Sequence, residues 1–512
     1  MEQVVIVGGG PVGLWLAAEL RLGGADVTVL EARAERDARS KALTVHPRTL
    51  ELLASRGIAD RFLADGRRIP GGHFGALDER LPFGGLDTPF PFTLALPQAR
   101  TEELLEEHAV AMGARVLRRH RAVRLTQDGE RVRIEAAGPA GPYVLDARYA
   151  VGCDGTRSTV RDAAGIGFPG TPATAWGWLA DVVLDDPPPG GALSVSGPAG
   201  GVMVVPLTET LHRVVGTDPA WLGADWPGDP TLDGLRAKVA RIAGGDLGMR
   251  DPHWLSTFGN AARQADRYRA GRVLLAGDAA HMHFPAGGVG LNVGLQDAAN
   301  LGWRLAATVR GDAPDGRLLD GYHAERHPVG ADLLLATRAQ TALMTAFDSD
   351  GQALRALLGG LVAAVPDLAD ALALRLTGLG VAYPAPPGAH PLTGRRAPDL
   401  ALAGTTLFTL LHAGRHVLLD LAGDAPPPAD AHRLTVHSGP AAGAGAEWAG
   451  VRAALVRPDG HVAWAADTAD PDGLAAAVAG RFAGPGEARP SGGRVSAGSS
   501  GRPGAGSRGG GG

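Results

Sequence analysis

The stretch VVIVGGGPVGLWLAAELRLGGADVTVLEA, residues 4–32, constrains the fold more than any other part of the chain. A β-branched run leads into a glycine cluster, then an apolar stretch with Pro11 in its first turn, then a Gly-Gly break and a second strand-like run. Proline is tolerated there because the first helical residue needs no N–H partner. The pattern predicts buried parallel strands at 4–7 and 27–30, joined by a helix.

Gly8, Gly10 and Gly13 fit the pattern G-x-G-x-x-G where this helix begins. Glycines at these positions let the turn tighten, let the backbone approach a pyrophosphate and let the helix pack on the strand. Glu31 ends the second strand, close to the place of an acid that binds a ribose 2′-hydroxyl, and its charge disfavours a 2′-phosphate. The segment predicts a site for NAD or the ADP half of FAD, with a glycine-rich turn of another α/β fold as the alternative.

The overall composition narrows the class of protein. A chain of 512 residues is expected to form about two or three domains. The net charge of −5 gives no sign of a nucleic-acid or anionic-membrane partner. Cys153 is the only cysteine, which excludes an internal disulfide and a cysteine-rich zinc site. No signal peptide and no apolar run of roughly 18 residues is visible, so we expect a cytoplasmic protein.

A second motif, GRVLLAGDAAHMHFPAGGVGLN at 271–292, places a carboxylate at the end of a strand and glycines before a helix. Asp278 at that strand end can accept hydrogen bonds from ribityl hydroxyls. Gly288 and Gly290 let the backbone run against a flavin ring, and a helix starting near Gly290 aims its N–H groups at the ring edge that carries negative charge after reduction. The alternative is a strand-loop-helix turn with incidental glycines.

With CDGTRSTVR at 153–161, the segment 277–306 resembles the FAD-dependent aromatic hydroxylases, the class A flavin monooxygenases. FGNAARQADRYRAGRVLLAGDAAH, YHAERHPVG and ALVRPDGHVAWAA resemble, more narrowly, the bacterial polyketide hydroxylases of angucycline and anthracycline pathways, with rifampicin monooxygenases as near relatives. The resemblance covers roughly residues 3–483. It implies an α/β fold with a Rossmann-like FAD-binding domain of the p-hydroxybenzoate hydroxylase type, an inserted β-sheet substrate domain and a C-terminal thioredoxin-like domain.

These domains are assigned from composition and resemblance together. The FAD-binding domain is expected at 1–173 and 265–382, and the substrate domain at 174–264 with part of 68–97. Residues 383–483, which begin with a linker-like stretch, are expected to form the thioredoxin-like domain. The Gly/Ser/Pro/Arg-rich tail, 484–512, is expected to be disordered.

The resemblance also implies a set of cofactor contacts. The residues it assigns to FAD are Gly8, Gly10, Pro11, Val12, Gly13, Glu31, Ala32, Arg33, Lys41, Arg48, Gln98, Asp154, Gly155, Asp278, Pro285, Gly288, Gly290, Leu291 and Asn292. Two positions depart from the family pattern. Lys41 stands where arginine is usual, which keeps the charge but loses the bidentate fork, and Val289 replaces a common glutamine.

The chemistry that the resemblance implies is reduction of FAD by NADPH, or by NADH, followed by reaction with O2 to a flavin C4a-hydroperoxide. This hydroperoxide hydroxylates a polycyclic aromatic polyketide in antibiotic biosynthesis. The reaction needs a large apolar pocket beside the flavin. Trp176 and Trp178, which share a strand face, Met203, Phe284 and Pro285 are the candidates for its lining, and domain core is the alternative reading for the strand residues.

Other functions stay open at this level. Baeyer–Villiger oxygenation or inactivation of an antibiotic keeps the flavin and changes the product, and a non-catalytic flavin-binding interaction protein is a remote alternative. His281 and His283 have no third ligand at metal spacing, so no metal is expected. No side chain is assigned as a general base. The expected partner is a small polycyclic aromatic molecule, without nucleic acid or membrane, and the protein is expected to be a monomer or homodimer.

Overall fold

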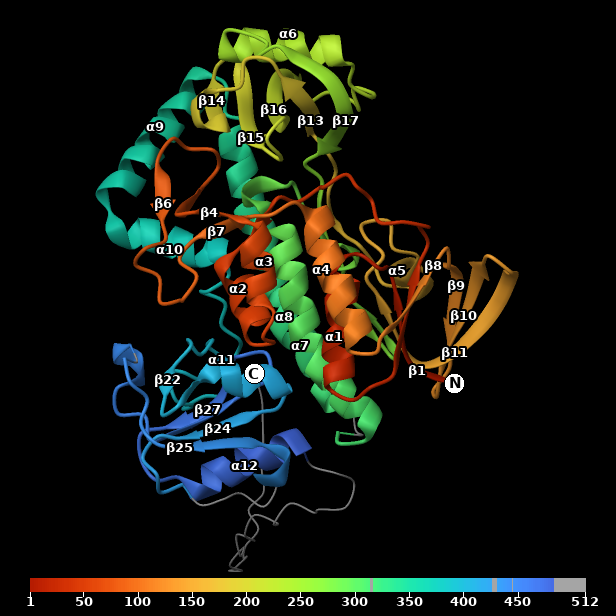
Figure 1. Ribbon diagram of the computed structural model, residues 1–512, viewed down its shortest axis with the longest axis vertical. Coiled ribbons are helices and arrows are strands. Elements are labelled where there is room, and N and C mark those ends of the chain that lie inside the picture. Colours follow the sequence, from red (N-terminus) through yellow and green to blue (C-terminus); the bar gives the residue numbers. More distant parts are fainter. Residues whose placement is uncertain (314–315, 426–430, 444, 483–512) are drawn as a thin grey trace, which may run out of the picture.

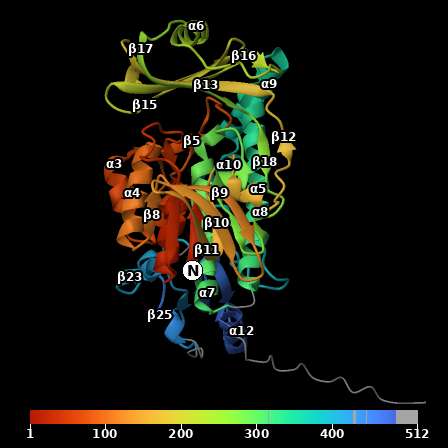
Figure 2. The same ribbon diagram turned by 90° about the vertical axis from the view of Figure 1, so that its right-hand side faces the viewer.

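The computed structural model describes residues 1–313, 316–425, 431–443 and 445–482. A five-stranded sheet covered by α6 (Leu232–Ala243) lies at one end, a larger α/β unit lies in the middle, and a small α/β unit lies at the other end (Figures 1 and 2). The tail for which disorder is expected, 484–512, lies outside the described residues.

The central unit is built on a sheet with strand order β19-β20-β11-β1-β2-β8, to which β10 and β9 are added from β11. β1 pairs in parallel with β2 and β11, and β11 pairs in parallel with β20, so the carboxyl ends of these strands meet at one edge. This is the doubly wound arrangement predicted from the N-terminal motif. Its strands are β1 (Glu2–Val7), β2 (Val27–Glu31), β8 (Arg115–Arg118), β9 (Arg121–Gln127), β10 (Val132–Gly138), β11 (Gly141–Gly152), β19 (Arg269–Ala270) and β20 (Val273–Leu275).

Helices pack on this sheet and beside it: α1 packs directly on α7, and α10 packs on α9 and on β6. The helices are α1 (Pro11–Leu22), α2 (Pro47–Ala54), α3 (Ala59–Asp65), α4 (Gln98–Ala111), α5 (Thr159–Ala163), α7 (Gly290–Arg310), α8 (Arg317–Met344), α9 (Ser349–Ala364) and α10 (Pro366–Thr377). Short sheets complete the unit: β3 (Thr44–Val45), β7 (Thr93–Ala95) and β4 (Arg67–Ile69); β5 (Gly71–His73) and β6 (Arg80–Pro82); β12 (Gly170–Thr171), β18 (Ala262–Gln264) and β21 (His281–Met282).

The sheet beneath α6 has two different faces. Its antiparallel strands run in the order β14 (Leu193–Gly197), β15 (Gly200–Pro206), β16 (Leu211–Leu222), β13 (Ala175–Leu184) and β17 (Met249–Gly259). Trp178 and Val204 pack with Leu235 of α6 in one apolar core. Because neighbouring residues of a strand point to opposite faces, Met203 and its partner Val215 lie on the face turned toward the central unit.

The C-terminal unit is a four-stranded sheet with a helix after it. The strands run in the order β25 (Thr435–Ser438), β24 (Val417–Asp420), β26 (Ala453–Val456) and β27 (Val462–Ala466). β24 and β25 are parallel and the other pairs are antiparallel, which is the strand arrangement of thioredoxin-like domains. β22 (Ala401–Leu402), β23 (Thr405–Thr406), α11 (Leu407–Leu410) and α12 (Pro471–Phe482) complete it.

The turn 457–461 between β26 and β27 reaches into the central unit. Arg457 is buried there, 2.8 Å from Glu325 of α8, and also pairs with Asp459. Arg56, which pairs with Glu19, donates to the Pro458 carbonyl at 2.9 Å. Buried charges of opposite sign therefore join the C-terminal unit to the central unit.

Among the described residues, no single helix is long and apolar enough to cross a membrane, although α9 and α10 together, bent by 101°, meet that test of length and composition.

The limits given above for the FAD-binding, substrate and thioredoxin-like domains stay predictions.

Candidate active site

The glycine loop after β1 is closed on one side and open on the other. Gly8 has a φ of 108°, and a Cβ there would lie 2.3 Å from the Cys153 carbonyl oxygen. A Cβ at Gly13 would lie 2.0 Å from the carbonyl oxygen of Gly8. Gly10, before Pro11, has no atom within 4 Å of its Cβ position, and no side chain caps α1. The first N–H groups of α1 therefore face open space, as a pyrophosphate site requires.

Glu31 holds this loop against the end of β2. Its Oε2 accepts a hydrogen bond from the Gly9 N–H at 2.7 Å, and its Oε1 accepts one from the Arg33 N–H at 2.8 Å. Ala32 is half-buried and the Arg33 side chain is exposed. The carboxylate thus lies beside the glycine loop, at the position expected for a ribose-binding acid.

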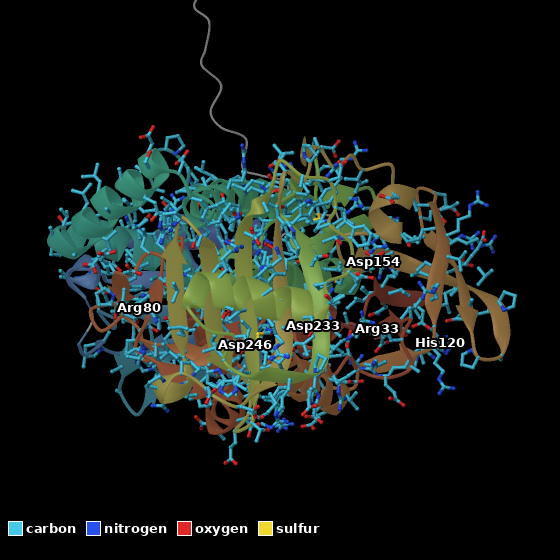
Figure 3. All side chains as sticks on the ribbon, turned by 90° about the horizontal axis from the view of Figure 1, so that it is seen from above. Arg33, Arg80, His120, Asp154, Asp233 and Asp246 are labelled. Carbon is cyan, nitrogen blue, oxygen red and sulfur yellow. The ribbon has the colours of Figure 1, made fainter. Side chains whose placement is uncertain are left out.

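The Asp-Gly turn after β11 lies against the same loop. The Cys153 N–H donates to the Val7 carbonyl at 2.8 Å, and Asp154 accepts hydrogen bonds from Ser158 and from the Val160 N–H. Burial raises the pKa of Asp154, although the Ser158 hydrogen bond opposes that rise. Gly155 has a φ of 79° and an open Cβ position. Figure 3 shows Arg33 and Asp154 on one side of the molecule, to the right of α6 in that view.

The second motif lies beside the first. Val12 of α1 contacts both Gly277 and Gly294, where an added Cβ would approach it to 2.9 and 2.6 Å. Asp278 is exposed and makes no hydrogen bond or ion pair with the described residues. The carboxylate is therefore available to hydroxyl groups of a cofactor bound along α1.

The loop after Asp278, which we call the flavin loop (residues 278–290), leads to the uncapped start of α7. Pro285 is exposed, and Gly288 has a φ of 65° with a Cβ position only 2.3 Å from Thr44 Oγ1. α7 begins at Gly290, as predicted, and no side chain caps it. The Gly290 and half-buried Leu291 positions thus lie at a helix N-terminus open to a ligand. Two uncapped helix ends and two glycine cradles fit FAD.

Gln98 positions the segment that carries Lys41. It is the first residue of α4, and its Oε1 accepts a hydrogen bond from the Ala42 N–H at 3.0 Å. Lys41 is exposed, and its carbonyl accepts a hydrogen bond from Arg213 at 3.4 Å. Gln98 therefore orders the loop in which Lys41 replaces the usual arginine.

Two residues predicted to contact the cofactor use their side chains within the protein instead. The buried guanidinium of Arg48 pairs with Glu51 at 2.8 Å and donates to the Asp459 carbonyl at 2.6 Å, so its charge stabilises the interface with the C-terminal unit. Asn292 accepts from the His46 N–H and the Thr49 hydroxyl. It also donates to the Thr44 and Gly288 carbonyls, so its amide has no hydrogen-bonding capacity left.

The two tryptophans proposed for the substrate pocket do not line one. Trp178 is fully buried in the core against α6, and Trp176 donates its indole N–H to the Ala224 carbonyl at 3.1 Å. The prediction is wrong because α6 covers the sheet face on which Trp178 lies. Met203 is on the opposite face, toward the central unit.

A cavity of about 410 Å³ lies where β12 and β18 connect the central unit to the five-stranded sheet. Its lining is Thr171, Pro172, Thr174, Asn260, Ala262, Phe284, Thr337, Arg338, Thr341, Ala342 and Thr345. Phe284, predicted for the pocket, thus connects the cavity to the flavin loop, and its ring lies 5.1 Å from that of Phe258 in the five-stranded sheet. The volume lies within the range of small-molecule sites.

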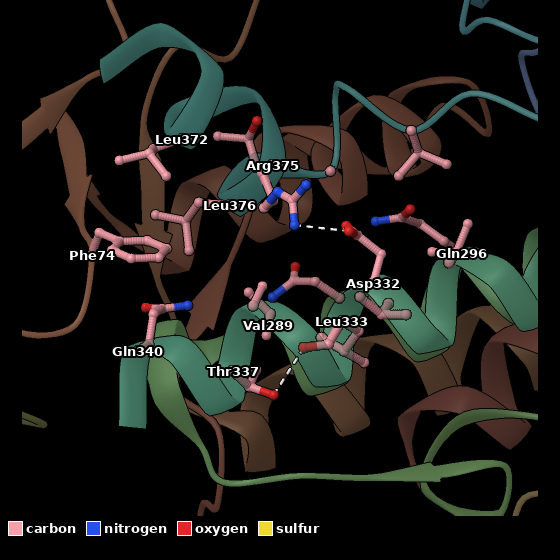
Figure 4. Close-up of a pocket in the computed structure, with 17 residues that line it drawn as sticks. Phe74, Val289, Gln296, Asp332, Leu333, Thr337, Gln340, Leu372, Arg375 and Leu376 are labelled. Carbon is pink, nitrogen blue, oxygen red and sulfur yellow. Dashed lines mark hydrogen bonds and ion pairs between the residues drawn. The ribbon is translucent and has the colours of Figure 1, made fainter. Parts of the chain in front are cut away.

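A second cavity, between α7, α8 and α10, measures only about 50 Å³ and is too small for a polycyclic ring system (Figure 4). Figure 4 shows the Arg375–Asp332 ion pair above it. Within the part of the chain that the structure describes, no three His, Cys, Asp or Glu side chains gather as metal ligands.

Sequence reasoning missed two groups of residues. Asp297 holds the turn that contains Asp278 from behind, through bonds to Gly277 and His281, and Arg326 in turn donates to Asp297. Thr337 and Thr341 of α8, with Thr345 directly after its end, form one wall of the larger cavity. Their spacing of four residues places them on one helix face, a signal that the sequence already contained.

Comparison with known proteins identifies the family. Residues 1–337 match the family described as FAD binding domain, and residues 390–485 match the family described as aromatic-ring hydroxylase, C-terminal. An aromatic compound monooxygenase of Bacillus subtilis is 47% identical, over 92% of this chain and 95% of that protein. A rifampicin monooxygenase of Streptomyces venezuelae is 43% identical, over 91% and 96%.

The solved structure of the anhydrotetracycline hydroxylase of Streptomyces rimosus superposes with a TM-score of 0.85 at 43% identity, covering 94% of this chain and 99% of that one. With the open glycine cradles and the free helix N-termini, these matches establish that the chain belongs to the FAD-dependent aromatic-ring hydroxylases and is a flavin monooxygenase.

Proposed function

We propose that this monooxygenase hydroxylates a polycyclic aromatic polyketide in antibiotic biosynthesis, with NADPH as the electron donor and O2 as the cosubstrate. The observation that carries the proposal is the position of Phe284. It belongs to the flavin loop and also lines the 410 Å³ cavity, so a substrate in that cavity lies next to the loop that approaches the ring.

Each part of the site has a role in that reaction. Bound FAD supplies hydride acceptance and the activation of oxygen. The N–H groups at the start of α1 bind the pyrophosphate, and Asp278 accepts hydrogen bonds from ribityl hydroxyls. The N–H groups at the start of α7 stabilise negative charge on the ring edge. Phe284 and Phe258 exclude water from the reacting centre.

The substrate class is proposed from the relatives. They are named for anhydrotetracycline and for rifampicin, which supports a large ring system rather than a single phenol. The rifampicin relative also supports a second candidate, oxidation of a finished antibiotic that inactivates it, including a Baeyer–Villiger outcome. Both candidates use the same cavity and differ in the product.

The test is turnover of the purified flavoprotein with NADPH and ¹⁸O₂ in the presence of anhydrotetracycline or rifampicin, with products analysed by mass spectrometry. A product that gains one labelled oxygen atom on an intact ring supports hydroxylation, and a labelled ester or opened ring supports the second candidate. Release of all reducing equivalents as hydrogen peroxide with both compounds would overturn the proposed function, because NADPH would then reduce oxygen without oxidising either ring system.

Three further properties complete the proposal. We propose NADPH rather than NADH on the family resemblance, and steady-state kinetics with each donor decides between them. A cytoplasmic location is proposed because the reaction consumes NADPH, which the cytoplasm supplies. The protein is proposed to be a monomer or homodimer, which light scattering of the purified holoenzyme resolves.

A further inference from the structure

The 410 Å³ cavity has few hydrogen-bond donors. The hydroxyls of Thr337, Thr341 and Thr345 donate to the carbonyls of Leu333, Thr337 and Thr341, at 2.8, 2.7 and 2.8 Å. These threonines therefore offer the cavity methyl groups and acceptor lone pairs. The amide of Asn260 is bonded to Thr174 and Ala175.

Arg338 is the exception in this lining. It is the only ionisable residue among those that line the cavity, and no Asp or Glu accompanies it. Its exposed side chain makes no hydrogen bond or ion pair with the residues that the structure describes. By contrast, Arg375 of α10, which lines the smaller cavity, pairs with Asp332 at 2.7 Å.

An unpaired guanidinium at the mouth of an apolar cavity selects for an anionic oxygen. Its planar N–H groups can bind one or two oxygens of such a group, and the bond is stronger because the donor is charged. No carboxylate in the lining competes for it. Polycyclic aromatic polyketides carry phenol and enol groups that ionise readily, and the resulting anion matches the charge of Arg338.

We infer that Arg338 is a specificity-determining residue that binds an ionised phenol or enol oxygen of the substrate at the cavity mouth, while the ring system extends toward Phe284. The inference rests on the proposed function and adds to it the acidic group that the substrate carries. It also assigns a direction to the bound molecule, with the acidic edge toward α8 and the reacting edge toward the flavin loop.

The experiment compares binding of 2-hydroxyanthraquinone and 2-methoxyanthraquinone to the holoenzyme, by calorimetry and by the change in flavin absorbance. The pH is set above the pKa of the phenol, so that only the hydroxy compound is an anion. We expect the wild type to bind the hydroxy compound roughly tenfold more tightly, the size of one hydrogen bond to a charged group. Arg338→Gln should abolish the preference and Arg338→Lys should keep part of it.

Arg375→Gln is the matched control, since it removes an exposed arginine from a neighbouring helix and should keep the full preference. A wild type without preference, or a preference that survives in Arg338→Gln, would overturn the inference. Because binding is read without turnover, the result is separable from the oxygen-insertion test. A preference for the anion without oxygen insertion supports the Arg338 site and rejects the proposed reaction.

Discussion

Asp297 of α7 lies behind the flavin loop and contacts His281 of that loop, with 2.7 Å between the carboxylate Oδ2 and the imidazole Nε2. The same oxygen accepts a hydrogen bond from the Gly277 N–H at 3.1 Å, and Oδ1 accepts one from Arg326 at 2.7 Å. Burial raises the pKa of Asp297, but the charges and hydrogen bonds of Arg326 and His281 lower it by more. The pKa is therefore below its usual value and the carboxyl stays ionised. The turn that presents Asp278 is therefore held on both sides by one buried carboxylate.

Asp297→Asn should destabilise the protein and weaken FAD binding. The variant leaves Arg326, which is fully buried, without its charge partner, and breaking a buried pair in this way costs about 3–5 kcal/mol. Thermal unfolding and a fluorescence titration with FAD measure the two effects. The control is Asp332→Asn. Asp332 pairs with Arg375, and the two side chains are 49% and 44% exposed, so this ion pair should contribute roughly 0–1 kcal/mol to stability. Equal melting temperatures for the two variants would contradict this reading of Asp297.

Gly10→Ala should weaken FAD binding without disturbing the fold. The Cβ position of Gly10 is empty within 4 Å, so the methyl group fits the protein and meets only the cofactor. We expect FAD affinity to fall roughly tenfold or more, which corresponds to about 1.4 kcal/mol, with unchanged circular dichroism. Gly84→Ala, at another open glycine, should bind FAD normally. Normal FAD affinity of Gly10→Ala would place the pyrophosphate elsewhere.

Phe284 and Trp178 should behave differently when shortened. Phe284→Ala opens the contact with Phe258 beside the flavin loop, so water reaches the site and more of the NADPH consumed should appear as hydrogen peroxide. Trp178→Phe, in the core under α6, should lower stability by roughly 1–3 kcal/mol and leave the ratio of product to NADPH unchanged. Simultaneous assay of NADPH, peroxide and product distinguishes the two variants. A rise in peroxide release with Trp178→Phe would mean that Trp178 lines the substrate pocket after all.

Arg457→Gln should loosen the C-terminal unit. Asp459 then remains buried without its arginine partner, a loss of about 3–5 kcal/mol, whereas Glu325 keeps its pair with Arg304 at 2.7 Å. Limited proteolysis should cut the connection at 383–400 faster than in the wild type. Arg452→Gln, which removes a partner of Asp424 on the surface, should leave the rate unchanged. A wild-type cleavage rate in Arg457→Gln would mean that apolar packing alone holds this interface.

His46 should make stability fall in mild acid. Burial lowers the pKa of His46 from 6.5 to about 4, against the opposing hydrogen bond to the Leu376 carbonyl. The unfolded chain then takes up the proton first, so the stability is complete above pH 6.5 and is lost as the pH falls toward 4, by up to about 3 kcal/mol. His46→Gln should reduce the dependence of the melting temperature on pH between 4 and 6.5. His253→Gln, at an exposed site, should not change that dependence. An unchanged slope in His46→Gln would rule out this contribution.

Sequence predicted the features that depend on neighbouring residues. The strand, glycine turn and helix at the N-terminus and the start of α7 at Gly290 follow from local pattern, because backbone freedom and hydrophobic period act over a few residues. The strand that leads into Asp278 likewise follows from a short buried apolar run, Val273–Leu275. These elements are enough to predict where a dinucleotide-type cofactor binds.

Sequence could not predict the environment of side chains that distant segments surround. Arg48 meets a carbonyl 411 residues away, and no local pattern distinguishes an arginine that contacts a cofactor from one that meets another domain. Asn292 is bonded to a segment more than 240 residues earlier. The alternation of residues along a strand shows that Trp176 and Trp178 share a face. It does not show which face α6 covers, and α6 covers the face that carries Trp178.

The turn 457–461 has a consequence for the order of folding during synthesis. The ribosome makes Glu19, Arg48 and Arg56 some four hundred residues before it makes the turn that covers them. Domains fold in the order in which they emerge, so the central unit forms its sheet while these paired charges still face water. A late segment therefore covers an early one, and the buried ionic interface is completed only after the turn 457–461 has been translated.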